Sequence, residues 1–143
     1  IDCRVQSKPN RFFRGVIDTD EAFTFTMCNP PFHASTQDAF EGSKRKAQNL
    51  AHSKFMKPKA DFAGLNNELV CEGGEYVFLS NMIEESKLFA EQVQWFTSLV
   101  SKGENVKPLI RKLKEVGCQQ HRVIEMATGN KQSRILAWSF IKE

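Results

Sequence analysis

The sequence predicts an α/β fold with a parallel part and a closing antiparallel hairpin. Three observations support this prediction. An apolar, β-prone run at 23–28 ends abruptly in an Asn-Pro-Pro-Phe motif at 29–32. Helix-like and strand-like stretches then alternate over 72–116. Finally, two β-rich stretches, 119–126 and 133–141, follow each other across a short polar loop, which is typical of a hairpin.

The N-terminal part predicts two strands. Residues 1–6 alternate between apolar and polar side chains, as an edge strand does, and are followed by a polar turn at 7–10. A short apolar segment occupies 12–17. The run 23–28 is more continuously apolar and predicts a buried strand.

A helix is predicted to begin near Glu72, where Glu-Gly-Gly-Glu precedes a helical pattern. Its inner face would carry Leu79, Met82, Ile83, Ser86 and Ala90. Its outer face would carry Glu84, Glu85 and Lys87. The apolar stripe is interpreted as core, because it contains no cofactor-binding pattern.

The C-terminal part predicts three strands and one helix. Residues 93–100 form a β-rich run that predicts a second buried strand. A helix is predicted over 105–116, with a proline in its first turn and Gly117 as its end. Its inward residues would be Leu109, Ile110, Leu113 and Val116. The hairpin loop is predicted at 127–132.

Composition indicates one globular domain. The chain has 143 residues, of which 41% are hydrophobic and 26% charged. Neither a membrane-spanning run nor a signal peptide is evident, and the isoleucine at position 1 suggests a start within a longer protein. The four cysteines contain no C-x-x-C pair, which favours reduced thiols in a cytoplasm: Cys3, Cys28, Cys71 and Cys118. Neither these cysteines nor the scattered histidines, His33, His52 and His121, predict a metal site.

The Asn-Pro-Pro-Phe motif is the segment whose residue types indicate a binding or catalytic site. Each proline fixes its own φ, so the backbone leaves the strand rigid at the edge where α/β sheets bind ligands. The Asn29 amide oxygen and the Pro30 carbonyl could each accept an N–H from one NH2 group, while Phe32 stacks on a planar ring. Such an arrangement suits an adenine amine or a glutamine amide. The alternative is an ordinary tight turn, since Asn and Pro are common turn formers.

A cationic stretch follows the motif. Between residues 42 and 60 there is no acidic residue but six cations: Lys44, Arg45, Lys46, Lys54, Lys57 and Lys59. These residues suit contact with an RNA backbone, especially with Phe55 among them to stack on an unpaired base. A solvated helix and loop is the alternative interpretation.

Several segments together resemble the bacterial 23S ribosomal RNA adenine-N6 methyltransferases of the RlmF type and, more distantly, the eukaryotic methyltransferase of a spliceosomal small nuclear RNA. The matching segments keep the same order along nearly the whole chain: 26–33, 42–46, 71–75, 82–87, 95–105 and 131–138. The resemblance implies the C-terminal half of a Rossmann-like, class I S-adenosylmethionine-dependent methyltransferase sheet. Residues 1–143 would then be a partial domain.

The resemblance also implies a reaction and a site. A methyl group would pass from S-adenosylmethionine to the N6 amine of an adenosine in 23S ribosomal RNA. Asn29, Pro30, Pro31 and Phe32 would form the catalytic motif. Asn29 would also contact the cofactor, and by position Gln6 and Lys8 would edge the adenine of the cofactor. The chain has no G-x-G, so on its own it is expected to bind cofactor poorly.

Two other functions fit the same residues: methylation of a protein glutamine, and RNA binding without catalysis. A sheet that ends at 1–6 would also expose an edge strand with apolar groups beside it, including Phe12, Phe13 and Val16. The chain is therefore expected to self-associate through its N-terminal side.

Overall fold

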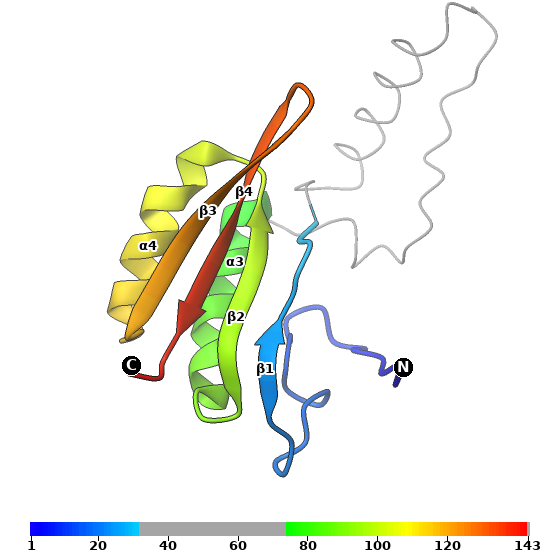
Figure 1. The fold of residues 1–143 in the computed structure, drawn as a ribbon. Coiled ribbons are helices and arrows are strands. Elements are labelled where there is room, and N and C mark those ends of the chain that lie inside the picture. Colours follow the sequence, from blue (N-terminus) through cyan, green and yellow to red (C-terminus); the bar gives the residue numbers. More distant parts are fainter. Residues whose placement is uncertain (32–73, 143) are drawn as a thin grey trace, which may run out of the picture.

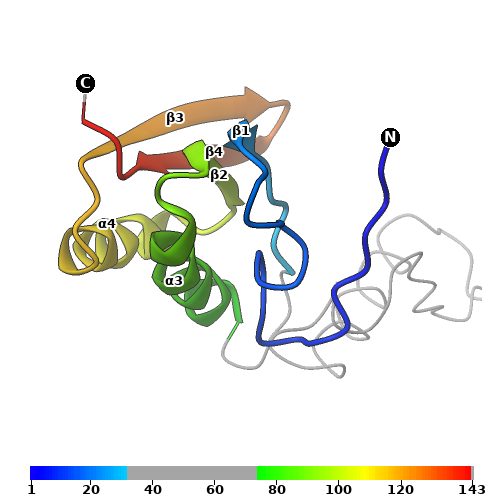
Figure 2. The same ribbon diagram turned by 90° about the horizontal axis from the view of Figure 1, so that it is seen from below.

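The computed structural model describes residues 1–31 and 74–142. Within them a four-stranded sheet has the order β1-β2-β4-β3, and two α-helices pack on one of its faces (Figures 1 and 2). The elements are β1 (Phe23–Thr26), α3 (Gly74–Ser86), β2 (Val93–Val100), α4 (Val106–Glu115), β3 (Gln120–Thr128) and β4 (Lys131–Ser139), with short 3-10 turns η1 (Lys87–Phe89) and η2 (Gly103–Asn105). Neither helix is long and apolar enough to cross a membrane, in the part of the chain that is described.

The predicted parallel part is formed by β1 and β2, with Phe25 beside Trp95. The prediction that 23–28 is a buried strand was wrong: β1 ends at Thr26 and none of its residues is buried, because the described helices cover only one face of the sheet. Pairing continues past the end of β1, because the Leu99 N–H donates to the Cys28 carbonyl over 2.9 Å. The carboxyl ends of the two strands therefore lie side by side, and the chain leaves β1 at Asn29 next to β2.

The predicted hairpin is confirmed, but its loop is shorter than expected. β3 and β4 pair from Gln120↔Ser139 to Thr128↔Lys131, so only Gly129 and Asn130 connect them. Gly129 has φ +63°, which a two-residue hairpin turn accepts readily at a glycine. The predicted loop at 127–132 was too long. Its first and last residues are assigned to the loop because they show no apolar pattern, but strands can pair through their backbones without one.

The core lies between the sheet and the two helices. Its fully buried side chains include Leu79 and Ile83 of α3, Phe96 and Val100 of β2, Leu109 and Leu113 of α4, and Leu136 and Trp138 of β4. Trp138 stacks on Phe96 with ring centroids 5.8 Å apart. Its indole N–H donates to the Ser86 hydroxyl over 2.9 Å, so the one polar atom of the ring is satisfied.

The other face of the sheet is uncovered by the described residues, since both helices lie on the same side (Figure 2). Alternation along the strands puts Phe25, Trp95 and Ile124 on this open face. Phe25 is 58% exposed and Ile124 51% exposed. The Arg122 guanidinium lies 6.0 Å from the centre of the Trp95 ring. Parallel strands are normally covered on both faces of their sheet, so an open face that carries exposed apolar side chains is unusual.

The prediction of a strand at 1–6 was wrong. This segment pairs with no strand among the described residues, and β1 forms the edge of the described sheet. The alternation is real, but a strand also needs a neighbour to pair with, and Arg4 instead binds carboxylates and a carbonyl. Phe13 is not left under-covered either, because it is buried against Phe96 and Phe89.

Candidate active site

The Asn-Pro-Pro turn follows β1 directly. Pro30 and Pro31 are buried, whereas the Asn29 side chain is exposed. Because the prolines fix their own φ angles and are packed into the protein, the backbone that carries Asn29 is held firmly. The turn therefore presents an accessible amide from a rigid base. Phe32, the fourth residue of the motif, lies outside the described residues.

Asn29 borders a cavity of about 420 Å³ that three separate segments enclose. The N-terminal segment supplies most of the lining, α3 supplies Phe78, and the turn supplies Asn29 and Pro31. The remaining lining residues are Arg4, Val5, Gln6, Lys8, Pro9, Arg11 and Phe12. The structure thus brings Gln6 and Lys8 to the same cavity as Asn29, although more than 20 positions separate them in sequence.

Two aromatic rings form one wall of the cavity. Phe12 and Phe78 meet edge to face, with ring centroids 4.9 Å apart. Sequence reasoning missed both, because each sits in an ordinary apolar pattern. Only the packing of the N-terminal segment against α3 turns them into a pocket wall.

Glu85 holds that wall in place, and its predicted location on the outer face of α3 was wrong. The residue is only 6% exposed. Its carboxylate accepts the N–H groups of Phe12 at 3.0 Å, Phe13 at 2.6 Å and Arg14 at 2.8 Å. The sequence does contain a signal for this position: Glu85 follows the inward-facing Met82 by three residues, and residues three apart lie on the same side of a helix. A buried carboxylate can be tolerated there because three donors satisfy it.

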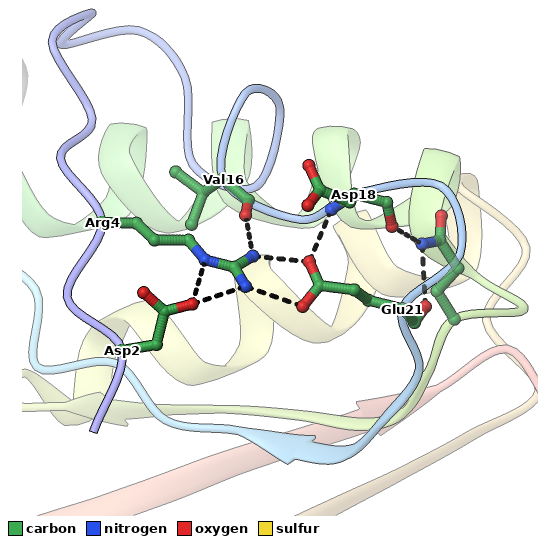
Figure 3. Close-up of polar contacts among 6 residues, drawn as sticks. Asp2, Arg4, Val16, Asp18 and Glu21 are labelled. Carbon is green, nitrogen blue, oxygen red and sulfur yellow. Dashed lines mark hydrogen bonds and ion pairs between the residues drawn. The ribbon is translucent and has the colours of Figure 1, made fainter.

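A second polar cluster fastens the N-terminal segment (Figure 3). The Arg4 guanidinium binds the Glu21 carboxylate through two hydrogen bonds of 2.5 and 2.8 Å, and it binds Asp2 at 2.9 Å. Arg4 also donates to the Val16 carbonyl at 2.6 Å. These hydrogen bonds from Arg4, and then the Asp18 N–H, lower the pKa of Glu21 to about 2. The charge of Arg4 is thereby balanced within the protein.

Gln6 is also committed to local structure. Its amide nitrogen donates to the Arg14 carbonyl over 2.7 Å, and its amide oxygen accepts the Lys8 N–H over 3.3 Å. Both polar atoms of the Gln6 side chain therefore stabilise the local backbone. A ligand in the cavity would contact this side chain mainly by van der Waals packing.

The carboxyl end of β2 is fixed by Glu75, from the first turn of α3. The buried carboxylate accepts hydrogen bonds from the Ser101 N–H at 2.8 Å, the Ser101 hydroxyl at 2.5 Å, the Lys102 N–H at 3.1 Å and the Asn105 amide at 3.0 Å. Burial raises the pKa of Glu75, but these hydrogen bonds outweigh burial and leave it below the ordinary value.

This balance makes stability depend on pH. Because the pKa of Glu75 lies below its ordinary 4.5, the ionised form stabilises the fold fully above that pH and progressively less as the pH falls through the folded-state value. We expect the free energy of unfolding, measured with urea at pH 7 and at pH 3, to fall more in the wild type than in Glu75→Gln. The exposed Glu104→Gln is the matched control, and an equal fall in all three proteins would contradict the prediction.

Cys28 does not qualify as a nucleophile. Burial raises the pKa of its thiol, despite a hydrogen bond with Ser98. The thiolate is the reactive form, so a raised pKa makes this cysteine inert at neutral pH. Across residues 1–31 and 74–142, no group of three metal-ligating side chains gathers.

A turn with an accessible amide, placed at the carboxyl end of a parallel strand and beside a cavity, is the ligand-binding arrangement of open α/β sheets. With the closing antiparallel hairpin, it defines the chain as part of a class I S-adenosylmethionine-dependent methyltransferase fold. The sequence profile of an RNA methyltransferase family matches residues 1–142. The chain belongs to this RNA methyltransferase family.

Curated relatives carry the name ribosomal RNA large subunit methyltransferase F. The protein of Desulfotalea psychrophila is 51% identical over 145 residues, covering 100% of this chain and 47% of the relative. That of Shewanella oneidensis is 51% identical, covering 98% of this chain and 40% of the relative. That of Bacteroides thetaiotaomicron is 49% identical and covers 99% and 46%. The chain thus spans less than half the length of these relatives.

Among solved structures, the chain is similar to the catalytic domain of human METTL16 bound to RNA hairpins. In the complex with MAT2A 3′UTR hairpin 1, the TM-score is 0.66 at 26% identity, over 90% of this chain and 43% of that one. In the complex with hairpin 6, it is 0.61 at 27% identity, over 84% and 41%. A human METTL16 domain in complex with SAH is 22% identical with a TM-score of 0.59 and shares the fold.

The predicted RNA-binding residues are not among those that the structure describes. The basic residues Lys44, Arg45, Lys46, Lys54, Lys57 and Lys59 lie outside the described ranges, as do His33 and His52. His121 is on β3 and does not line the cavity. The roles of the basic residues stay predictions.

Proposed function

We propose that this chain is the catalytic-motif half of an enzyme that methylates the N6 amine of an adenosine in 23S ribosomal RNA. The observation that carries the proposal is the exposed Asn29 amide, held by buried prolines at the carboxyl end of β1 and beside an aromatic-walled cavity. The names of the curated relatives support the substrate class. We place the enzyme with this substrate in the cytoplasm.

Asn29 and Pro30 would act by positioning the amine. The lone pair of an adenine amine is delocalised into the ring, so the nitrogen is a poor nucleophile. When the Asn29 amide oxygen and the Pro30 carbonyl each accept one N–H, the nitrogen moves towards tetrahedral geometry and aims its lone pair at the methyl carbon. Phe32 would stack on the base, a contact worth about 1–3 kcal/mol. The target adenosine must be unpaired or flipped out for the amine to be free.

The residues present fit S-adenosylmethionine as the methyl donor, because the cavity combines aromatic walls with the accessible amide of Asn29. Asn29 would contact the cofactor beside Gln6, one of the two lining residues predicted for it. The bound cofactor supplies an activated methyl group on a sulfonium. Asn29 and Pro30 would hold the amine nitrogen in line with that methyl group, and the proton lost from the amine would pass to solvent. Such in-line transfer depends mainly on alignment.

An acceptor assay tests the proposal. A protein that contains this chain together with a glycine-rich cofactor loop is incubated with radiolabelled cofactor and either deproteinised ribosomal RNA or ribosomal proteins. We expect label in N6-methyladenosine of the RNA. Label in a protein glutamine would replace the RNA assignment, and RNA binding without any transfer would favour a non-catalytic module.

We further propose that the isolated chain self-associates through its N-terminal side, at β1. The edge strand β1 carries Phe23 and Phe25, which are exposed beside the open sheet face. We expect light scattering at micromolar concentration to detect a dimer or larger species, and Phe25→Glu to shift it towards monomer. Leu88→Glu, at an exposed site on the helix side, is the matched control. A clean wild-type monomer would contradict the prediction.

A further inference from the structure

The charge around the cavity is unbalanced. Three of its lining residues are basic, namely Arg4, Lys8 and Arg11, and none is acidic. Asp2 and Glu21 neutralise Arg4. In contrast, neither Lys8 nor Arg11 forms an ion pair with any carboxylate in the described ranges. Within residues 1–31 and 74–142, two positive charges without a paired carboxylate therefore border the space that Asn29 also borders.

These two charges are held in place by the backbone around them. The Arg11 N–H donates to the Lys8 carbonyl over 3.1 Å and closes a turn. Gln6 accepts the Lys8 N–H. Glu85 fixes the next residues through their N–H groups. The turn that carries Lys8 and Arg11 is thus ordered before a ligand arrives, which lowers the entropic cost of binding.

The sign of the charge discriminates between the two ligands of a methyltransferase. The methyl donor, whose reactive centre is a sulfonium cation, would lie against the aromatic wall of Phe12 and Phe78 and would gain no attraction from the positive charges of Lys8 and Arg11. An RNA chain carries one negative charge per phosphate, and Lys and Arg are the side chains that neutralise phosphates. The charge balance therefore favours the nucleic acid as the partner of Lys8 and Arg11.

We propose that Lys8 and Arg11 bind the phosphate groups that flank the target nucleotide while Asn29 holds its base. This inference rests on the proposed function and moves Lys8 from the predicted cofactor contact to the RNA. Phosphate contacts set the position and orientation of a nucleic acid without reading its sequence. Lys8 and Arg11 would therefore position the adenosine for the Asn29 turn, whatever bases surround it.

The experiment measures RNA affinity as a function of salt. A fluorescently labelled single-stranded oligoribonucleotide containing adenosine is titrated with the chain at several salt concentrations. The double variant K8Q/R11Q is compared with K107Q/R111Q, which removes the same two charges from the exposed surface of α4. Circular dichroism of each variant checks that the fold is kept.

We expect K8Q/R11Q to reduce the slope of log affinity against log salt by about 1.4, since each phosphate contact with a single strand contributes about 0.7. Near 0.1 M salt, this corresponds to a loss of affinity of roughly 10- to 30-fold. The control K107Q/R111Q should keep the wild-type slope. In a protein that includes the cofactor loop, the affinity for S-adenosylhomocysteine should be unchanged in K8Q/R11Q.

A wild-type slope in K8Q/R11Q, with RNA binding and methylation intact in the wild type, would overturn the inference and leave the proposed function standing. An equal loss of slope in both double variants would overturn it as well, because the effect would then be one of net charge. Tenfold weaker binding of S-adenosylhomocysteine at unchanged RNA affinity would overturn the inference and indicate that Lys8 and Arg11 bind the cofactor instead. Absence of RNA binding by the wild type would instead count against the proposed function itself.

Discussion

Asn29→Ala is expected to lower the rate of methyl transfer by roughly 100-fold or more, the usual cost of removing one preorganised hydrogen-bonding group from an active site. The variant lacks the amide oxygen that accepts one of the two N–H groups of the amine. Without it, the amine is neither held nor drawn towards tetrahedral geometry. The fold should be unaffected, because the Asn29 side chain is exposed and the buried Pro30 and Pro31 hold the turn.

Single-turnover methylation of ribosomal RNA by a protein that contains the complete cofactor site would measure this effect. Asn81→Ala is the matched control, since it removes the same exposed amide from the surface of α3. Urea unfolding should give both variants the wild-type free energy of unfolding. Near-normal turnover of Asn29→Ala would refute the assignment of Asn29 as the residue that aligns the amine.

The largest effect on stability is expected for Glu85→Ala. The substitution leaves the N–H groups of Phe12, Phe13 and Arg14 without their acceptor, and the Phe13 N–H is buried. An unsatisfied buried donor costs about 1–3 kcal/mol, and hydrogen bonds to a charged group are at the upper end of the range. We therefore expect the free energy of unfolding to fall by about 2–4 kcal/mol.

The neighbouring Glu84 offers a matched control for this substitution. Its side chain is 62% exposed and pairs with Lys112 on the surface. Exposed ion pairs contribute little, so Glu84→Ala should change stability by less than about 1 kcal/mol. Urea unfolding of the two variants gives the comparison directly, and similar losses in both would mean that Glu85 does not anchor residues 12–14.

Local patterns predicted most elements of the fold. The alternating and continuous apolar runs placed β2 at Val93–Val100 without error, and the helical spacing with Pro108 and Gly117 placed α4 to within a residue or two. The Asn-Pro-Pro turn was also evident, because proline restricts the backbone wherever it occurs. These features depend on residues close together in sequence, which is why periodicity and turn chemistry reveal them.

What the sequence by itself determined is therefore the order and type of the α-helices and strands that the structure describes, and the position of the Asn29 turn at the end of a strand. Only the tertiary structure decided that residues 1–6 stay outside the sheet, that Glu85 is buried, and that Lys8 and Arg11 share a cavity with Asn29. Glu85 meets Phe12 across 73 positions of sequence. Strand pairing, desolvation and charge balance all depend on such distant partners, and a local pattern contains no information about them.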